Sequence, residues 1–348
     1  MNNLIEILAN EPPYRQKQIQ AAWFDIKVRS YDQISTLPQS LRFKLANADF
    51  LTVAPTGVAE DKDDQTFKTL LHLKDGVAIE TVLMGRVNKK LVGREGETRY
   101  TICVSSQVGC PMRCTFCATG RLGLKRNLTW QEILDQYRFW NYFIADNLKG
   151  RIDNIVFMGQ GEPMLNYENV KQTINLILKN TDLGPRQITV STVGVKAGME
   201  KIVTDPEWPP VRFALSLHSA ITETRQKLIP SHSGGFLEWL PEWSKQYHER
   251  FPSRNHFVGL EYTFINGTND DDKHLKALVK LASKLGKVRI NLIPYNSTDP
   301  NMLGSPIETI EHWRDELMKK DFVVTIRRSQ GQRIAAACGQ LANKQSEK

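Results

Sequence analysis

Three closely spaced cysteines, Cys110, Cys114 and Cys117, are the residues of this sequence best suited to metal chemistry. Their spacing is C-x3-C-x2-C, and cysteine thiolates are the usual ligands of a 4Fe-4S cluster, which normally takes four of them. A loop with three cysteines therefore leaves one iron open to a small molecule. The alternative is a zinc site with Cys103 as the fourth ligand, but zinc sites favour cysteine pairs that are well separated in sequence. The spacing favours a catalytic iron–sulfur cluster.

The cysteine count also indicates the compartment. The chain has five cysteines, and the crowding of the triplet is unlike a secreted disulfide framework. A reducing compartment would keep these thiols available. No basic leader precedes an apolar run at the start, and no stretch approaches the ~18 apolar residues of a membrane span. We therefore expect a cytoplasmic protein that is not inserted in a membrane.

Regular elements must hold the cysteine loop, and after Arg99 the sequence alternates apolar, strand-like runs with amphipathic helices. Thr129 and Glu132 form a capping box that marks the clearest helix start. Apolar strands joined by helices indicate a parallel sheet. Six such units predict an α/β fold, an open, partial (β/α)6 TIM-like barrel whose ligands bind at the C-terminal ends of the strands. The strand candidates are residues 100–104, 154–158, 187–191, 211–217, 258–264 and 288–293.

The sequence on either side of the barrel divides into flanking parts. Two strand-like runs, 66–73 and 77–83, are separated by Asp75 and Gly76, which is a hairpin signal. The N-terminal part is polar with a narrow apolar stripe, which is typical of helices. The expected boundaries are 1–50 for a helical accessory domain that binds RNA, 51–98 for a small β extension, 99–315 for the barrel, and 316–348 for a C-terminal strand and the loop with Cys338.

Polar groups follow several of the predicted strands. The segment from Gly159 to Pro163 is not a dinucleotide-binding fingerprint, because Met164 replaces the third glycine and Glu162 would repel a pyrophosphate. A carboxylate beside bare backbone could instead accept hydrogen bonds from an ammonium group. Other polar residues at strand ends would, taken singly, more often be satisfied buried groups or turn formers. Their shared position favours one ligand site, and they are Ser191, Ser216, His218 and Asn296.

The chain carries an excess of positive charge, with 46 Lys and Arg against 38 Asp and Glu, a formal net charge of +8. Such an excess favours a polyanionic partner such as RNA, although it also occurs in ordinary basic proteins. Basic and aromatic side chains could contact phosphates and stack on bases, and a solvated helix face is the competing interpretation. These residues are Tyr14, Arg15, Lys17, Trp23, Arg121, Lys125 and Arg126.

Taken together, these motifs resemble the RlmN and Cfr group of RNA adenine methyltransferases in the radical S-adenosylmethionine superfamily. The matching segments are 103–110, 116–120, 157–163, 216–218 and 336–341, in order along the chain. The resemblance implies a 4Fe-4S cluster on the three cysteines and two molecules of S-adenosylmethionine per turnover. It also assigns to S-adenosylmethionine the residues Gly161, Glu162, Ser191, Ser216, Leu217, His218 and Asn296.

The resemblance further implies how a carbon atom could be methylated. Cys338 takes a methyl group from a first S-adenosylmethionine, and a 5'-deoxyadenosyl radical from a second one removes hydrogen from that methyl. The carbon radical can add to an adenine carbon, which is electrophilic and does not react with a sulfonium. Release then needs a second thiol, Cys103, which forms a transient disulfide with Cys338, and a proton acceptor, Glu80. Taken alone, Glu80 would be a solvated strand carboxylate, and Cys338 a small buried apolar residue.

Within this group, the segments 107–109 and 161–166 favour the RlmN subgroup, which methylates carbon 2, over the Cfr subgroup, which methylates carbon 8. The expected partners are 23S rRNA, tRNA as a second substrate, and an electron donor such as flavodoxin or ferredoxin, with the enzyme a monomer. We expect the target base to be flipped out of its stack. The alternatives are a radical enzyme acting on a small molecule, where Cys338 has no role, and a non-enzymatic RNA-binding protein with zinc.

One segment departs from the family pattern. Before the methyl-carrying cysteine the family usually has Gly-x-Asp-Ile, whereas this chain has Gly331, Gln332, Arg333 and Ile334. Arginine replaces the acid here. Cys338 is still present, but the contacts that order its loop must differ from those of the family.

Overall fold

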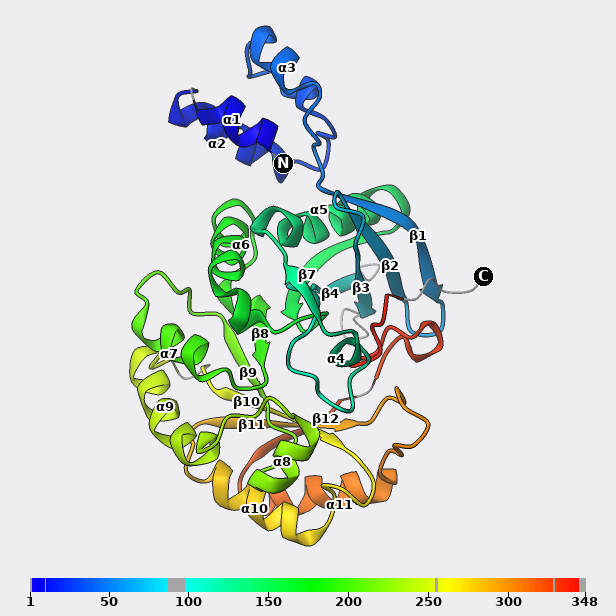
Figure 1. Ribbon diagram of the computed structural model, residues 1–348, viewed down its shortest axis with the longest axis vertical. Helices are drawn as coiled ribbons and strands as arrows, with labels where there is room; N and C mark the ends of the chain where they lie inside the picture. The colour runs from blue at the N-terminus through cyan, green and yellow to red at the C-terminus, as the bar shows by residue number, and fades with distance from the viewer. Residues whose placement is uncertain (1, 10, 87–97, 254–255, 328, 344–348) are drawn as a thin grey trace, which may run out of the picture.

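A single ten-stranded sheet forms the centre of the molecule in the computed structural model, which describes residues 2–9, 11–86, 98–253, 256–327 and 329–343 (Figure 1). The strand order is β1-β2-β3-β4-β7-β8-β9-β10-β11-β12. Two short strands, β5 (Gln107–Gly109) and β6 (Leu124–Asn127), pair separately beside it. The α/β fold class predicted from the sequence is confirmed.

The part of the sheet from β4 to β12 is parallel throughout. All six strand candidates are found, with each end within four residues of its predicted position, and the C-terminal strand β12 adds a seventh by pairing with β11. That strand therefore continues the barrel sheet. The parallel strands are β4 (Thr98–Cys103), β7 (Gly150–Phe157), β8 (Ile188–Thr192), β9 (Arg212–Ser216), β10 (Val258–Phe264), β11 (Val288–Pro294) and β12 (Val323–Ile326).

Helices cover the outer face of the parallel strands (Figure 1). Every residue of β10 is buried, as expected for a strand enclosed on both faces. Trp243 of α9 packs on Phe213 with ring centroids 4.8 Å apart, and Trp313 of α11 packs on Phe264 at 4.9 Å. The helices are α5 (Trp130–Asn147), α6 (Tyr167–Asn180), α7 (Lys196–Thr204), α8 (Thr222–Leu228), α9 (Phe236–Arg250), α10 (Asp272–Ala282) and α11 (Ile307–Met318).

The predicted capping box at the start of α5 is confirmed. The Thr129 side chain accepts a hydrogen bond from the Glu132 backbone N–H, and the Glu132 carboxylate accepts one from the Thr129 N–H at 2.8 Å. Such caps stabilise a helix by ~1 kcal/mol. The capped helix follows β6 in the chain, so the cap fixes where that strand gives way to the helix.

The β extension continues the same sheet in antiparallel fashion. Strands β1 (Val53–Asp61), β2 (Thr66–Leu73) and β3 (Ala78–Arg86) pair in sequence, and β3 pairs with β4. The predicted hairpin between β2 and β3 is confirmed, and Gly76 adopts φ 80° in its turn, a conformation that favours glycine. The extension thus shares a sheet with the barrel.

The N-terminal helices α1 (Asn2–Ala9), α2 (Pro13–Trp23) and α3 (Gln39–Leu45) stand together beside α5 (Figure 1). Arg138 of α5 is buried and donates hydrogen bonds to the backbone oxygens of Trp23, at 3.0 Å, and Phe50, at 2.7 Å. These bonds fasten the helical part to the barrel. Among the described residues, no helix combines the length and apolar character needed to span a membrane.

Candidate active site

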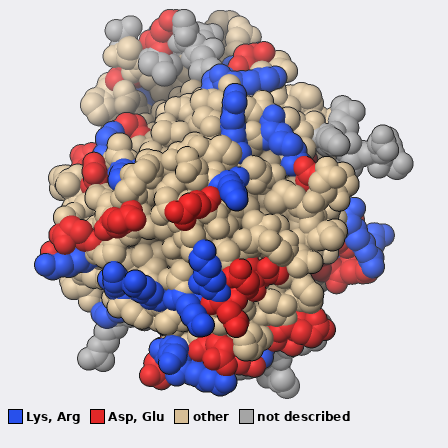
Figure 2. Space-filling view, turned by 60° about the horizontal axis from the view of Figure 1, so that its bottom comes forward, with Lys and Arg blue, Asp and Glu red and all other residues tan. Residues whose placement is uncertain are grey.

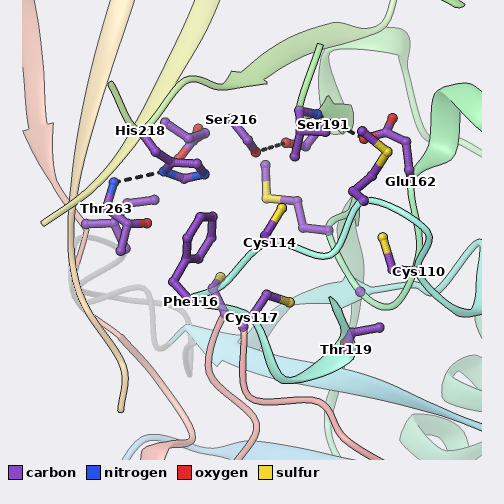
Figure 3. Close-up of a pocket in the computed structure, with 18 of the residues that line it drawn as sticks. Cys110, Cys114, Phe116, Cys117, Thr119, Glu162, Ser191, Ser216, His218 and Thr263 are labelled. Atoms are coloured by element: carbon purple, nitrogen blue, oxygen red, sulfur yellow. Dashed lines mark hydrogen bonds between the residues drawn. The ribbon is translucent and has the colours of Figure 1, made fainter. Parts of the chain in front are cut away.

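A cavity opens at the C-terminal ends of the parallel strands (Figure 3). Cys110, Cys114 and Cys117 all line it, together with residues that follow β7, β8 and β9. We call it the cluster cavity. The structure thus brings the cysteine triplet and the predicted strand-end residues to one place.

The cysteine loop is held by tight backbone packing. Cys117 is the residue before α4 (Ala118–Leu122), and its N–H donates to the Cys114 carbonyl at 3.1 Å. A Cβ atom on Gly120 would lie 2.9 Å from the backbone N and O atoms of Cys114. Glycine at this position therefore lets α4 pack directly on the loop that carries the thiols.

The donor set fits an iron–sulfur cluster. Burial raises the pKa of Cys110 to about 12 and that of Cys114 well above its usual value, and repulsion from Cys117 adds to both. Buried thiolates need a cation beside them, and iron provides it. Among the described residues, no three His, Cys, Asp or Glu side chains converge closely enough to hold a single metal ion. The spacing of the three cysteines suits a cubane 4Fe-4S cluster, in which each cysteine sulfur binds a different iron.

The turn after β7 approaches the cysteine side of the cavity through glycine. Gly161 adopts φ 100°, and a Cβ atom there would lie 2.5 Å from the Gln107 side chain. A Cβ on Gly159 would lie 2.7 Å from the Val104 carbonyl oxygen. At these two positions of the predicted ligand segment, close contacts therefore leave no room for a side chain.

Glu162 links the ends of two neighbouring strands. Its carboxylate is buried and accepts hydrogen bonds from the N–H of Met164 at 3.0 Å and of Val193 at 2.9 Å. Burial raises the pKa of this carboxyl. Ser191 and Ser216 lie beside it on the cavity wall, with their hydroxyl oxygens 3.2 Å apart (Figure 3). These groups offer oxygen acceptors to a bound ammonium or hydroxyl group.

His218 is held as a neutral donor. Its Nδ1 accepts a hydrogen bond from the Thr263 N–H at 3.1 Å, and its ring meets Phe116 edge-on with centroids 4.5 Å apart (Figure 3). Burial lowers the pKa of His218 to about 3. The remaining proton therefore sits on Nε2. The adjacent Leu217, predicted as a ligand residue, is fully buried in the hydrophobic core and does not line the cavity.

Asn296 connects the cluster cavity to the C-terminal loop. Its amide nitrogen donates to the Cys338 carbonyl at 3.1 Å, and its amide oxygen accepts from Gln332 at 2.8 Å. Gln332 is the residue before Arg333, where the chain departs from the family pattern, so this segment still makes a contact that orders the loop. The neighbouring Arg333 is exposed and pairs with Asp63.

A second cavity, which we call the thiol cavity, adjoins the first and shares part of its lining. Cys103 and Cys338 both line it, and Cys338 also lines the cluster cavity. Cys338 is exposed, whereas Cys103, the last residue of β4, is buried. Burial, and then the neighbouring Cys338, raises the pKa of Cys103 to about 12. The two thiols predicted to react with one another therefore share one chamber.

Glu80 lies outside the walls of both cavities. It is 1% exposed and pairs with Lys68 at 2.9 Å. Its other oxygen accepts hydrogen bonds from the backbone of Ala342 and Asn343. The interpretation of Glu80 as a solvated carboxylate is wrong, and its role as a proton acceptor stays a prediction.

Two arginines at the site carried no motif and were missed by sequence reasoning. Arg327 follows β12, lines both cavities and pairs with Glu261 at 3.2 Å. Its electrostatic interaction with the neighbouring Cys338 raises the pKa of Arg327. Arg225 is fully buried beneath the cluster cavity and donates to the Leu217 carbonyl at 3.2 Å. Only the tertiary structure shows that this residue of α8 is buried.

The residues predicted to bind RNA differ in how exposed they are. Trp23 is buried against Trp130, with ring centroids 5.9 Å apart, so its predicted role in stacking on bases is wrong. Arg126 is engaged with Asp75 and Glu132. Basic and acidic side chains are interspersed over the face in Figure 2. The exposed candidates are Tyr14, Lys17, Arg121 and Lys125, while Arg15 is partly buried.

Comparison with known proteins adds to this geometry. Residues 104–279 match the family model described as Radical SAM superfamily. A Chlorobium phaeobacteroides protein named probable dual-specificity RNA methyltransferase RlmN is 38% identical over 360 residues, which is 99% of this chain and 94% of the relative. A Thermus thermophilus protein of the same name is 38% identical, covering 98% and 93%. The crystal structure of a radical SAM methyltransferase from Sphaerobacter thermophilus superposes with a TM-score of 0.83 at 32% identity, covering 97% and 96%.

Proposed function

Because the chain belongs to the RlmN-type family of dual-specificity RNA methyltransferases in the radical SAM superfamily, we propose that it methylates carbon 2 of an adenosine in 23S rRNA, with tRNA as a second substrate. The observation that carries this proposal is the position of Cys338, which lines the cluster cavity and the thiol cavity at once. One sulfur can thus meet the methyl donor on one side and both the substrate and Cys103 on the other.

The cofactor site is proposed to be held by residues of the cluster cavity. Cys110, Cys114 and Cys117 would hold a 4Fe-4S cluster, and this cluster with S-adenosylmethionine supplies the methyl group and the radical chemistry. Glu162 would accept hydrogen bonds from the ammonium group of S-adenosylmethionine, since its carboxylate is fixed by two backbone N–H groups. His218 would donate from Nε2, because Nδ1 is already an acceptor.

The thiol cavity is proposed to release the product. Once the methyl carbon on Cys338 is bonded to adenine, the adduct must lose the proton on carbon 2 and its unpaired electron, for which the oxidised cluster would be the one-electron acceptor. The Cys103 thiol then gives up its proton and its sulfur attacks the Cys338 sulfur. A sulfur–sulfur bond forms, the sulfur–carbon bond breaks, and its electron pair stays on the carbon, which takes up a proton to become a methyl group. Glu80, the proposed proton acceptor for the hydrogen on carbon 2, can act only when Ala342 and Asn343 release its carboxylate.

The RNA is proposed to approach over the accessory helices and the cysteine loop. Lys17, Arg121 and Lys125 would contact phosphates, and Tyr14 would stack on a base, since these side chains are exposed. We place the enzyme in the cytoplasm as a monomer, with flavodoxin or ferredoxin as electron donor. The adenosine would be flipped from its stack to reach the thiol cavity.

One experiment tests the activity directly. Enzyme reconstituted with iron and sulfide is incubated with S-adenosylmethionine, a reductant, and either 23S rRNA or tRNA, and the digested nucleosides are analysed by mass spectrometry and chromatography against standards. We expect 2-methyladenosine. Formation of 8-methyladenosine would move the chain to the other subgroup, and no methylation of either RNA would contradict the proposal. Enzyme without reductant is the control.

A further inference from the structure

One buried ion pair lies beneath the loop that carries Cys338. Lys68 of β2 and Glu80 of β3 are diagonal neighbours on one face of the hairpin, with Lys68 Nζ 2.9 Å from Glu80 Oε1. Their side chains are 6% and 1% exposed. Buried charges persist where additional hydrogen bonds satisfy them, so the remaining partners of this pair show what it holds.

Those partners are backbone groups on both sides of Cys338. Lys68 Nζ donates to the Ala335 carbonyl at 3.2 Å. Glu80 Oε2 accepts from the N–H groups of Ala342 at 2.6 Å and Asn343 at 2.9 Å. The two charges therefore join residue 335, before the cysteine, to residues 342 and 343, after it. The loop is closed at its base by side chains from a distant hairpin.

The far side of the same loop rests on the start of α4, the helix that follows the cysteine loop. The Gly339 carbonyl accepts from the Ala118 N–H at 2.7 Å, and the Leu341 carbonyl accepts from Thr119 Oγ1 at 2.7 Å. Within the loop, Ala335 adopts φ 49°, a left-handed conformation that persists only where its surroundings impose it. The loop thus depends on contacts at both sides to keep its shape.

We propose that Lys68 and Glu80 form a clamp that positions Cys338 between the cluster cavity and Cys103. Lys68 is then a positioning residue for methyl transfer, although it touches neither cavity. Glu80 acts through the same loop, whether or not it also accepts a proton. This role rests on the proposed function, but the clamp itself can be measured without RNA or S-adenosylmethionine.

The first measurement is amide hydrogen exchange in the cluster-loaded full chain. In Lys68→Met, we expect exchange at Ala342 and Asn343 to rise at least tenfold, while amides of the buried strand β10 keep their wild-type rates. Lys68→Arg, which retains a cation and donors, should restore protection. The matched control is Lys74→Met on the same hairpin, because Lys74 pairs with the exposed Asp49 and not with the loop.

The second measurement is the equilibrium between the reduced thiols and the disulfide of Cys103 and Cys338, set against glutathione and read by peptide mass mapping. Loosening the loop lowers the effective concentration of one thiol at the other. We expect at least a tenfold weaker disulfide in Lys68→Met and in Glu80→Ala. Glu80→Gln keeps an oxygen acceptor, so it should stay within threefold of wild type even if its methylation is lost.

Unchanged exchange at residues 342 and 343, together with a wild-type disulfide equilibrium in Lys68→Met, would overturn the clamp. If that variant does not fold, Lys68→Met combined with Glu80→Gln removes both charges together and leaves no unpaired buried ion. The double variant must show the same tenfold rise in exchange, and wild-type exchange there would also overturn the clamp. A chain that methylates no RNA would contradict the proposed function and leave these readouts intact.

Discussion

The cluster cavity and the thiol cavity share a wall but are built differently. The cluster cavity takes its cysteines from one short loop and most of its other groups from the C-terminal ends of the parallel strands from β7 to β12. The thiol cavity brings together Cys103 and Cys338, and its loop depends on Lys68 and Glu80. The first is shaped by close packing at glycines and by strand ends that meet at one edge of the sheet, and the second by hydrogen bonds from the β2–β3 hairpin to the C-terminal loop. Variants should therefore fail in two recognisably different ways.

The largest effect is expected from Cys338→Ala, which should abolish methylation while leaving iron content and the cluster absorbance unchanged. The reason is that Cys338 is proposed to carry the methyl group but is not one of the three cysteines proposed to hold the cluster. Mass spectrometry of digested RNA and iron analysis check both parts. Cys114→Ala is the matched comparison and should lose iron as well as activity. Retained methylation in Cys338→Ala would contradict the division of the site into a cluster cavity and a thiol cavity with different roles.

A smaller loss is expected from Gly161→Ala on the cluster side. The added Cβ would lie 2.5 Å from Gln107 at a residue with φ 100°, which costs ~1–3 kcal/mol. If that strain displaces the Glu162 turn, S-adenosylmethionine binding should weaken about tenfold or more, as measured by equilibrium dialysis with the reconstituted enzyme. Gly184→Ala is the control, because its nearest neighbour would lie at 3.7 Å. Equal affinity in both variants would contradict the packing argument.

The cluster side should also contribute to the pH dependence of stability through His218. The unfolded side chain takes up a proton below a pH of about 6.5, whereas burial lowers the pKa of the folded one to about 3. The stability contributed by the neutral ring is therefore lost as the pH falls through this interval. When the pH falls from 7 to 5, the free energy of unfolding should therefore decrease in the wild type by about 2 kcal/mol more than in His218→Gln. Urea denaturation at the two pH values measures the difference, and parallel losses would refute it.

The smallest effect is expected on the thiol side, from Arg333→Ala. Arg333 and Asp63 form an ion pair whose side chains are 74% and 65% exposed, and such surface pairs contribute little. The disulfide equilibrium of Cys103 and Cys338 should stay within twofold of wild type. A large change would mean that the exposed pair, rather than Lys68 and Glu80, holds the loop. It would also give functional weight to the arginine that departs from the family pattern.

Much of the cluster side could be predicted from sequence because its determinants are local. The spacing of the cysteines, the capping box at Thr129 and the apolar runs that become parallel strands all depend on residues a few positions apart. Ser191, Ser216 and His218 follow from the same logic, since strand ends in a parallel sheet meet at one edge. The sequence also indicated the hairpin of β2 and β3 through its turn residues.

The thiol side and the buried residues were decided by tertiary structure. Trp23 carries the same aromatic signal whether it stacks on a base or packs under a helix, and only burial against Trp130 chose between them. Lys68, Glu80 and Arg327 show no pattern, because their partners lie up to 267 positions away. Local propensity and spacing act within one element, whereas burial and ion pairing depend on which distant segments the fold brings together.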